Sequence, residues 1–329
     1  MDFQTILMNK YYKKFLIISL LVTDLALIAW LIGPFDNKII SENKPVARAT
    51  STVASNHESL SATTSVTVKP PVVVPATFAN IKPLAQSVLV YDLSADNILY
   101  AKKEEVTRPI ASLSKLMTAY AATIMLPADA LITISADEAQ MESSAGLVAD
   151  EQWKLKDLIS FTLISSSNGG ASALARAASE LTGRNFIDEM NGLAKELGLN
   201  NTLFRNPTGL DFDEQLSGSY STALDLAKLY NHLLTNAPAV LAGTAKSSLS
   251  FFTENNDRHV ATNTNWLLAK IPNVISSKTG TTDLAGGNLA FIFQPVPGHQ
   301  VAVVILGSTA QGRFADAEKL ITATISHFK

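Results

Sequence analysis

The chain has 329 residues, of which 47% are hydrophobic and 17% are charged, and its formal net charge is −3. A chain of this length and composition buries a full core in one or two domains, which excludes a disordered protein. The basic residues form no cluster beyond the N-terminus, so nucleic acid is not an expected partner. The absence of cysteine excludes disulfides, thiolate metal ligands and a cysteine nucleophile.

The first element expected along the chain is a membrane-spanning helix over Phe15 to Ile32, directly after three closely spaced lysines. Asp24 interrupts this apolar run. The apolar side chains contribute roughly −0.3 to −0.6 kcal/mol each, which together outweigh the roughly +3 kcal/mol of one central carboxylate. A cleavable signal peptide is the alternative, but the nearest small-x-small site, Ala47-Arg48-Ala49, lies well past the run. We therefore expect residues 1–35 to form an uncleaved single-pass anchor in the cell membrane, with the rest of the chain outside the cytoplasm.

Residues 36–75 are rich in Ser, Thr, Val, Ala and Pro and show no helical or strand period, so we expect a tether. A flexible segment of this length has a root-mean-square span of roughly 35 to 40 Å. A single domain over residues 76–329 would then act away from the bilayer surface.

The globular part begins and ends with strand patterns. SVLVYDLSADNILYAKK is typical of a hairpin turning at Ser94 to Asn97, and NLAFIFQPVPGHQVAVVILGS is typical of another turning at Pro297-Gly298. Helical patterns lie between them, and Ala315 to Phe328 predicts a last helix. This order predicts an α+β fold in which helices pack against an antiparallel sheet.

Lys115 is the only charged side chain between Ile110 and Ala128. Apolar residues at i, i+3, i+4 and i+7 predict a helix that begins at Ser112 and ends at Pro127. The face around Lys115 is small rather than charged, so we expect the lysine to be buried beside Ser112. Burial lowers the pKa of an ammonium group and can leave a neutral amine that takes a hydroxyl proton. The alternative is a lysine that snorkels to water.

Two further segments carry candidate polar groups. A polar stretch interrupts a helical run that begins at Leu155 and resumes at Ala171, which predicts two helices joined by a loop. The stretch consists of Ser165, Ser166, Ser167 and Asn168. These residues either cap the second helix or aim a hydroxyl and an amide into a cleft.

The other segment is a strand-like run that carries Lys278-Thr279-Gly280-Thr281. On a sheet edge it could pair with an extended peptide, with Gly280 allowing close approach. The alternative is a solvated edge lysine that prevents aggregation.

Ser-x-x-Lys, Ser-x-Asn and Lys-Thr-Gly in this order form the motif set of penicillin-binding proteins and class A β-lactamases. Together with RPIASLSKLMTA, MNGLAKELGLNNTLFRNPTGLD, YSTALDLAKL and NTNWLL, they make residues 76–329 resemble the D-alanyl-D-alanine carboxypeptidases, the low-molecular-mass penicillin-binding serine peptidases. The resemblance implies a β-lactamase/transpeptidase-like fold with a helical subdomain, and neither cofactor nor metal. It also implies a peptidoglycan stem peptide ending in D-Ala-D-Ala as substrate and β-lactam antibiotics as covalent inhibitors.

The same resemblance implies a role for each residue of the first two motifs. Ser112 would be the nucleophile that forms the acyl-enzyme, and Lys115 would be its general base. The Ser166 hydroxyl would relay a proton to the leaving amine, and the Asn168 amide would hold the substrate peptide.

Lys278 and Thr279 would lie near the terminal carboxylate of the substrate, with Gly280 between Thr279 and Thr281. The backbone N–H groups of Ser112 and Thr281 would form the oxyanion hole.

Two features depart from the family pattern. Gly169-Gly170 follow Asn168 where the family usually has Asp-Ala, a departure that we expect to affect the rate more than the reaction type. Family members commonly continue into a β-rich domain and a C-terminal amphipathic helix, for which the N-terminal anchor would substitute here.

Four other functions compete with this interpretation. A class A-like β-lactamase would need a deacylating glutamate, and Glu196 offers Glu-x-x-Leu-Asn, but it falls inside a predicted helix that Gly198 ends. A zinc peptidase is disfavoured because the histidines are scattered. A D,D-endopeptidase and a non-catalytic wall-binding relative remain open.

Overall fold

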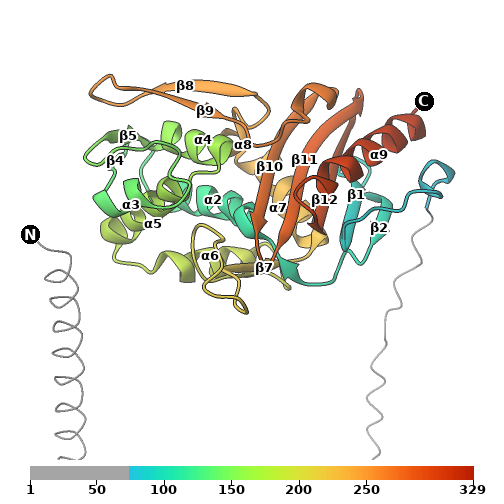
Figure 1. Ribbon diagram of the computed structural model, residues 1–329, viewed down its shortest axis with the longest axis horizontal. Coiled ribbons are helices and arrows are strands. Elements are labelled where there is room, and N and C mark those ends of the chain that lie inside the picture. Colours follow the sequence, from blue (N-terminus) through green and yellow to red (C-terminus); the bar gives the residue numbers. More distant parts are fainter. Residues whose placement is uncertain (1–73) are drawn as a thin grey trace, which may run out of the picture. The chain divides into compact units, whose positions relative to one another are not determined.

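The computed structural model describes residues 74–329, in which a five-stranded antiparallel sheet has the strand order β10-β11-β12-β1-β2 (Figure 1). Its strands are β1 (Ser87–Asp92), β2 (Asn97–Lys102), β10 (Val274–Thr282), β11 (Gly286–Val296) and β12 (His299–Ser308). Strands from the two ends of the domain therefore lie side by side, and β10 forms one edge. Both predicted hairpins are confirmed, since β1 pairs with β2 and β11 pairs with β12 across the expected turns.

Both faces of the sheet are buried, because successive side chains of a strand point to opposite sides. On β11, Leu289, Phe291 and Phe293 belong to a core that also contains residues of α9 (Gly312–His327). Ala290 and Ile292 belong to a larger core on the other face, which includes residues of α7 (Ala223–Asn236). The sheet thus separates two hydrophobic cores.

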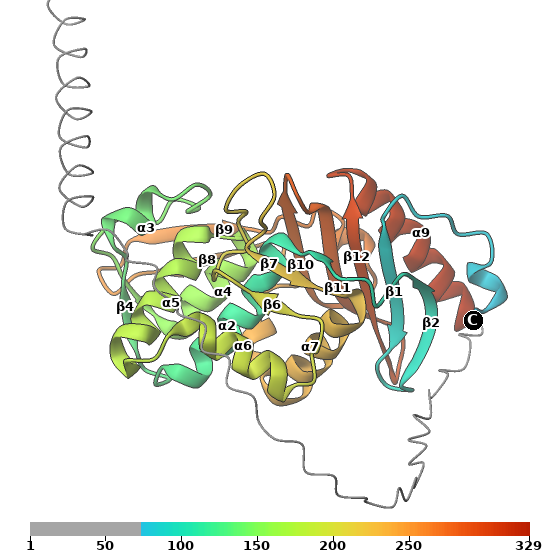
Figure 2. The same cartoon turned by 90° about the horizontal axis from the view of Figure 1, so that it is seen from below.

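Most of the remaining elements form a helical part on the side of β10, as both views show (Figures 1 and 2). Its other helices are α2 (Lys115–Met125), α3 (Ala136–Gln140), α4 (Leu155–Ser165), α5 (Asn168–Thr182), α6 (Phe186–Glu196) and α8 (Pro238–Leu241). Short 3-10 helices are η1 (Ala76–Phe78), η2 (Ala111–Ser114) and η3 (Leu268–Lys270). Three small sheets are formed by β3 (Arg108–Pro109) with β6 (Leu203–Phe204) and β7 (Ser219–Ser221), by β4 (Leu131–Thr133) with β5 (Gln152–Lys154), and by β8 (Ser248–Phe252) with β9 (Arg258–Thr262). The predicted α+β class and helical subdomain are confirmed.

Three predicted helix starts are wrong. The last helix begins at Gly312 rather than Ala315, and the other two errors lie at the candidate site. The first helix begins at Lys115, because Ser112 lies in the tighter turn of η2. The second helix begins at Asn168 rather than Ala171, since the Ser167 side chain accepts a hydrogen bond from the Gly170 N–H at 3.0 Å and caps it. The low helix propensity of glycine hid this start in the sequence.

The predicted anchor over residues 1–35 and almost all of the predicted tether over residues 36–75 lie outside the described residues, so both stay predictions. Over residues 74–329, the helices are too short or too polar to span a bilayer.

Candidate active site

Ser112 and Lys115 lie where η2 passes into α2. Lys115 is fully buried, as predicted, and its Nζ lies 2.8 Å from Ser112 Oγ, which is partly exposed. The preceding Ala111 has a φ of +48°, a conformation that costs a residue with a Cβ atom about 1–3 kcal/mol and persists only where packing holds it. The serine hydroxyl is therefore presented by a strained turn and faces a buried amine.

The other contacts of Lys115 orient its amine. In the ammonium form, Nζ also donates to Asn168 Oδ1 at 2.7 Å and to the Thr208 carbonyl at 2.6 Å. Because both of these groups only accept hydrogen bonds, they retain two N–H groups of the neutral amine, whose lone pair then faces the Ser112 hydroxyl. Burial, and to a smaller extent the charge of Lys278, lowers the pKa of Lys115 well below its ordinary value. The geometry suits proton abstraction from Ser112.

The Lys278 ammonium links the second and third motifs. Its Nζ donates to Ser166 Oγ at 2.7 Å and to the Thr279 carbonyl at 2.8 Å. Lys278 is only 1% exposed, so the alternative of a solvated edge lysine is wrong. Burial, together with the nearby Arg313, lowers the pKa of Lys278 to about 7. Ser166 itself ends α4 in the left-handed conformation, with φ +61°.

Strand β10 approaches the nucleophilic turn at Gly280. A Cβ atom on Gly280 would lie 2.9 Å from the Ile110 carbonyl oxygen and 3.0 Å from the Ser112 nitrogen. Gly280 must be a glycine because the backbone at the start of η2 occupies the place where a Cβ atom would lie. The sequence had suggested only that a bound peptide would need this room. This contact brings the backbone of Gly280 and Thr281 beside Ser112, where the resemblance predicts the oxyanion hole.

The structure also brings three residues to the site that the sequence patterns did not single out. Arg313 Nη1 donates to the Gly280 carbonyl at 2.8 Å and to Thr281 Oγ1 at 2.5 Å. Thr264 Oγ1 lies 2.5 Å from Thr279 Oγ1, and Thr208 supplies the carbonyl that binds Lys115. Thr208 and Thr264 lie within FRNPTGLD and NTNWLL, two of the segments that carry the family resemblance, whereas Arg313 lies in no such segment.

A family model described as D-alanyl-D-alanine carboxypeptidase matches residues 74–309. The D-alanyl-D-alanine endopeptidase of Escherichia coli (strain K12) is 32% identical to this chain, over 72% of this chain and 76% of that protein. The D-alanyl-D-alanine carboxypeptidase DacF of Bacillus subtilis (strain 168) is 30% identical, over 74% of this chain and 63% of that protein. The chain thus spans less than two thirds of the length of DacF.

Solved structures show the same likeness. Penicillin-binding protein D2 from Listeria monocytogenes in its ampicillin-bound form has 31% identity and a TM-score of 0.61, over 74% of this chain and 98% of that one. A mutant of the Streptomyces K15 DD-transpeptidase has 26% identity and a TM-score of 0.65, over 74% of this chain and 99% of that one. These matches confirm the predicted β-lactamase/transpeptidase-like fold.

Proposed function

The chain belongs to the D-alanyl-D-alanine carboxypeptidase family and is a serine-type D-alanyl-D-alanine carboxypeptidase, and we propose that its acyl-enzyme forms on Ser112. The observation that carries this proposal is the set of three contacts of Lys115, which direct a buried amine at one hydroxyl. In the chain described between residues 74 and 329, this is the site where all three sequence motifs meet.

These contacts support the first proton transfer of acylation, and the resemblance supplies the residue roles in the later steps. Lys115 takes the proton of Ser112 Oγ, and the oxygen attacks the carbonyl carbon of the penultimate D-alanine. The N–H groups of Ser112 and Thr281 bind the oxyanion. When the intermediate collapses, the C–N bond breaks, and the departing D-alanine amine receives the proton from Lys115 through the Ser166 hydroxyl. Water then hydrolyses the ester, with the same lysine as base, and releases the shortened peptide.

The carboxylate of the terminal D-alanine needs a cationic, donor-rich site at the other end of the cleft. Lys278, Thr279 and Thr281 lie along β10, and the Arg313 guanidinium adds positive charge behind Thr281. We propose that these groups bind the carboxylate of a peptidoglycan stem peptide and of a β-lactam that mimics it. The proposed location is outside the cytoplasm, with the protein held at the cell membrane by the predicted helix at its N-terminus.

A D,D-endopeptidase is the second candidate. The lengths of the relatives favour it, because the alignment with this chain covers 76% of the Escherichia coli endopeptidase but only 63% of the carboxypeptidase DacF. Both reactions use the same acyl-enzyme and differ in the group that follows the cleaved bond. Assaying release of D-alanine from a stem peptide beside cleavage of a cross-linked dimer would separate them.

The test of the nucleophile is intact mass spectrometry over time on the purified full chain mixed with benzylpenicillin. We expect a lasting adduct of one drug mass in the wild type and none in Ser112→Ala or Lys115→Ala. An adduct of normal yield in Ser112→Ala would refute the assignment. Hydrolysed drug that accumulates without a lasting adduct would indicate a β-lactamase, and neither product would indicate a non-catalytic binder.

A further inference from the structure

Asn168 is held in place by a turn that is not part of any motif. Its backbone N–H donates to the Ser143 carbonyl at 3.0 Å, and its Nδ2 donates to the Glu142 carbonyl at 2.9 Å. The neighbouring Ser167 Oγ donates to the Ser144 carbonyl at 2.7 Å. Since Nδ2 is bound by a carbonyl, a flip of the amide would lose that bond, and Oδ1 therefore stays on Lys115.

The turn over residues 142–144 does not hold this shape by itself. Ser143 and Ala145 have φ values of +55° and +64°, in the left-handed region that disfavours residues with a Cβ atom. Such conformations persist only when the surrounding structure imposes them. The turn follows α3, and α3 has only five residues, too few to be stable alone. Its position must come from what α3 contacts.

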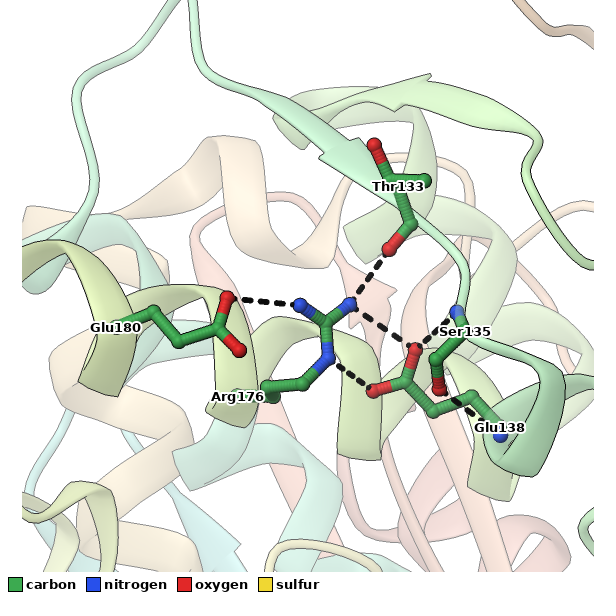
Figure 3. Close-up of polar contacts among 5 residues, drawn as sticks. All are labelled: Thr133, Ser135, Glu138, Arg176 and Glu180. Carbon is green, nitrogen blue, oxygen red and sulfur yellow. Dashed lines mark hydrogen bonds and ion pairs between the residues drawn. The ribbon is translucent and has the colours of Figure 1, made fainter.

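One contact that fixes α3 is an ion pair with the half-buried Arg176 of α5 (Figure 3). Glu138 of α3 is 3% exposed, and its two carboxylate oxygens accept from Arg176 Nε at 2.8 Å and Nη2 at 3.1 Å. The same Nη2 donates to the Thr133 carbonyl at 2.6 Å, just before α3. The planar guanidinium thereby ties α5 both to Glu138 within α3 and to Thr133 at the end of β4. The single ammonium of a lysine does not reproduce this set of contacts.

The other contact is a close approach of backbones at Gly169. A Cβ atom there would lie 2.2 Å from the Glu138 carbonyl oxygen and 3.1 Å from its carbon. Gly169 and Arg176 are seven residues apart in one helix, so they lie two turns apart on the same face. The glycine that departs from the family pattern and the arginine thus hold the same residue of α3, one through its main chain and the other through its side chain.

We infer that Arg176 is a positioning residue for the reaction and that, together with Gly169, it holds α3 so that the turn at 142–144 keeps Asn168 Oδ1 on Lys115. The inference rests on the roles proposed above for Lys115 and Asn168. It also gives Gly169 a function, because a side chain there would push α3 and its turn away from the site.

The test compares Arg176→Gln and Arg176→Lys with Glu180→Gln in the full chain. Glu180 is the exposed partner of Arg176, at 2.9 Å, and Figure 3 shows it joined to Arg176 and to no drawn residue of α3, so its variant is the matched control. We expect the acylation rate constant with benzylpenicillin to fall about ten- to hundredfold in Arg176→Gln, less in Arg176→Lys, and less than about twofold in Glu180→Gln. All are measured at a temperature where circular dichroism shows each variant folded.

A second pair of variants, at Gly169 and Gly192, tests the inference independently if an Arg176 variant fails to fold. Gly169→Ala is expected to slow acylation as Arg176→Gln does, whereas Gly192→Ala, where an added Cβ meets nothing within 4 Å, leaves the rate unchanged. Hydrogen exchange at the Asn168 amide is expected to be faster in Arg176→Gln and Gly169→Ala than in both controls. Acylation within about twofold of wild type in both test variants, or an equal loss in Glu180→Gln, would overturn the inference. Because exchange needs no turnover, it tests the positioning even if the Ser112 mechanism fails.

Discussion

The candidate site contains the buried Lys278, whose burial lowers the free energy of unfolding. The pKa of Lys278 is lowered from its ordinary 10.5 to about 7 by burial and by the charge of Arg313. Between these two pH values the unfolded chain binds a proton that the folded chain does not, so this group makes the free energy of unfolding rise with pH, by up to about 1.4 kcal/mol per unit. Below pH 7 both states carry the proton, and the burial penalty is constant.

We therefore expect Lys278→Met to be inactive but more stable than the wild type near pH 7, with an advantage that shrinks as the pH rises toward 10. Urea unfolding of both proteins at pH 7, 8 and 9 measures this difference. The exposed Lys246→Met serves as the control and is expected to keep the wild-type pH dependence. Parallel pH profiles for Lys278→Met and the wild type would contradict the proposed burial penalty.

Among the elements, the contact between β10 and η2 determines where the nucleophile lies. We expect Gly280→Ala to push the two backbones apart, because its Cβ would lie 2.9 Å from the Ile110 carbonyl oxygen. Overpacking of this kind costs about 1–3 kcal/mol of stability, and a shift of the nucleophile by about 1 Å lowers the rate of acylation about a hundredfold. Penicillin acylation and thermal unfolding on the same sample give the two quantities. A stability loss of this size with an unchanged rate would show that the contact does not position Ser112.

The same elements show how far the sequence could be read. Both hairpins and the helix that contains Glu196 were predicted correctly, because alternation and helical spacing are local signals. The starts of α2 and α5 were missed for different reasons. The start of α2 depends on the strained turn at Ala111, which only tertiary packing holds. The start of α5 lies at Asn168, behind a local cap at Ser167, and was hidden by the low helix propensity of the two glycines that follow it.

The site was predictable only where residue type carries the chemistry. The motif residues were named from the sequence, and the structure brings them together, although their roles remain proposals. The carbonyls of Thr208, Glu142 and Ser143 could not be predicted, because every residue has a carbonyl and these are contributed from distant segments. Arg313 was missed because it lies on a helix with no motif, and only the fold carries it to Gly280.

At the level of the whole molecule, the site lies where the five-stranded sheet meets the helical part (Figure 1). The sheet is buried on both faces, so two cores support β10. As an edge strand, β10 has one edge that is not paired with another strand of the sheet, and this edge faces the helical part. Ser112, Asn168 and Lys278 come from three separate segments and are joined by hydrogen bonds rather than by chain connectivity. Rigid support of each segment therefore matters more to the geometry than any one loop.

The predicted anchor leads to an expectation about the whole chain. Within the part of the chain that the structure describes, the site is built from residues 110–313, so we expect deletion of residues 1–35 to leave penicillin acylation within about twofold of wild type. The same deletion should move the protein from the membrane fraction to the soluble fraction, because it removes the apolar run from Phe15 to Ile32. Intact mass of the protein extracted from membranes would complete the test. A mass that begins at Met1 supports an anchor that stays attached, whereas a mass that begins beyond Ile32 would identify a cleaved signal and contradict it.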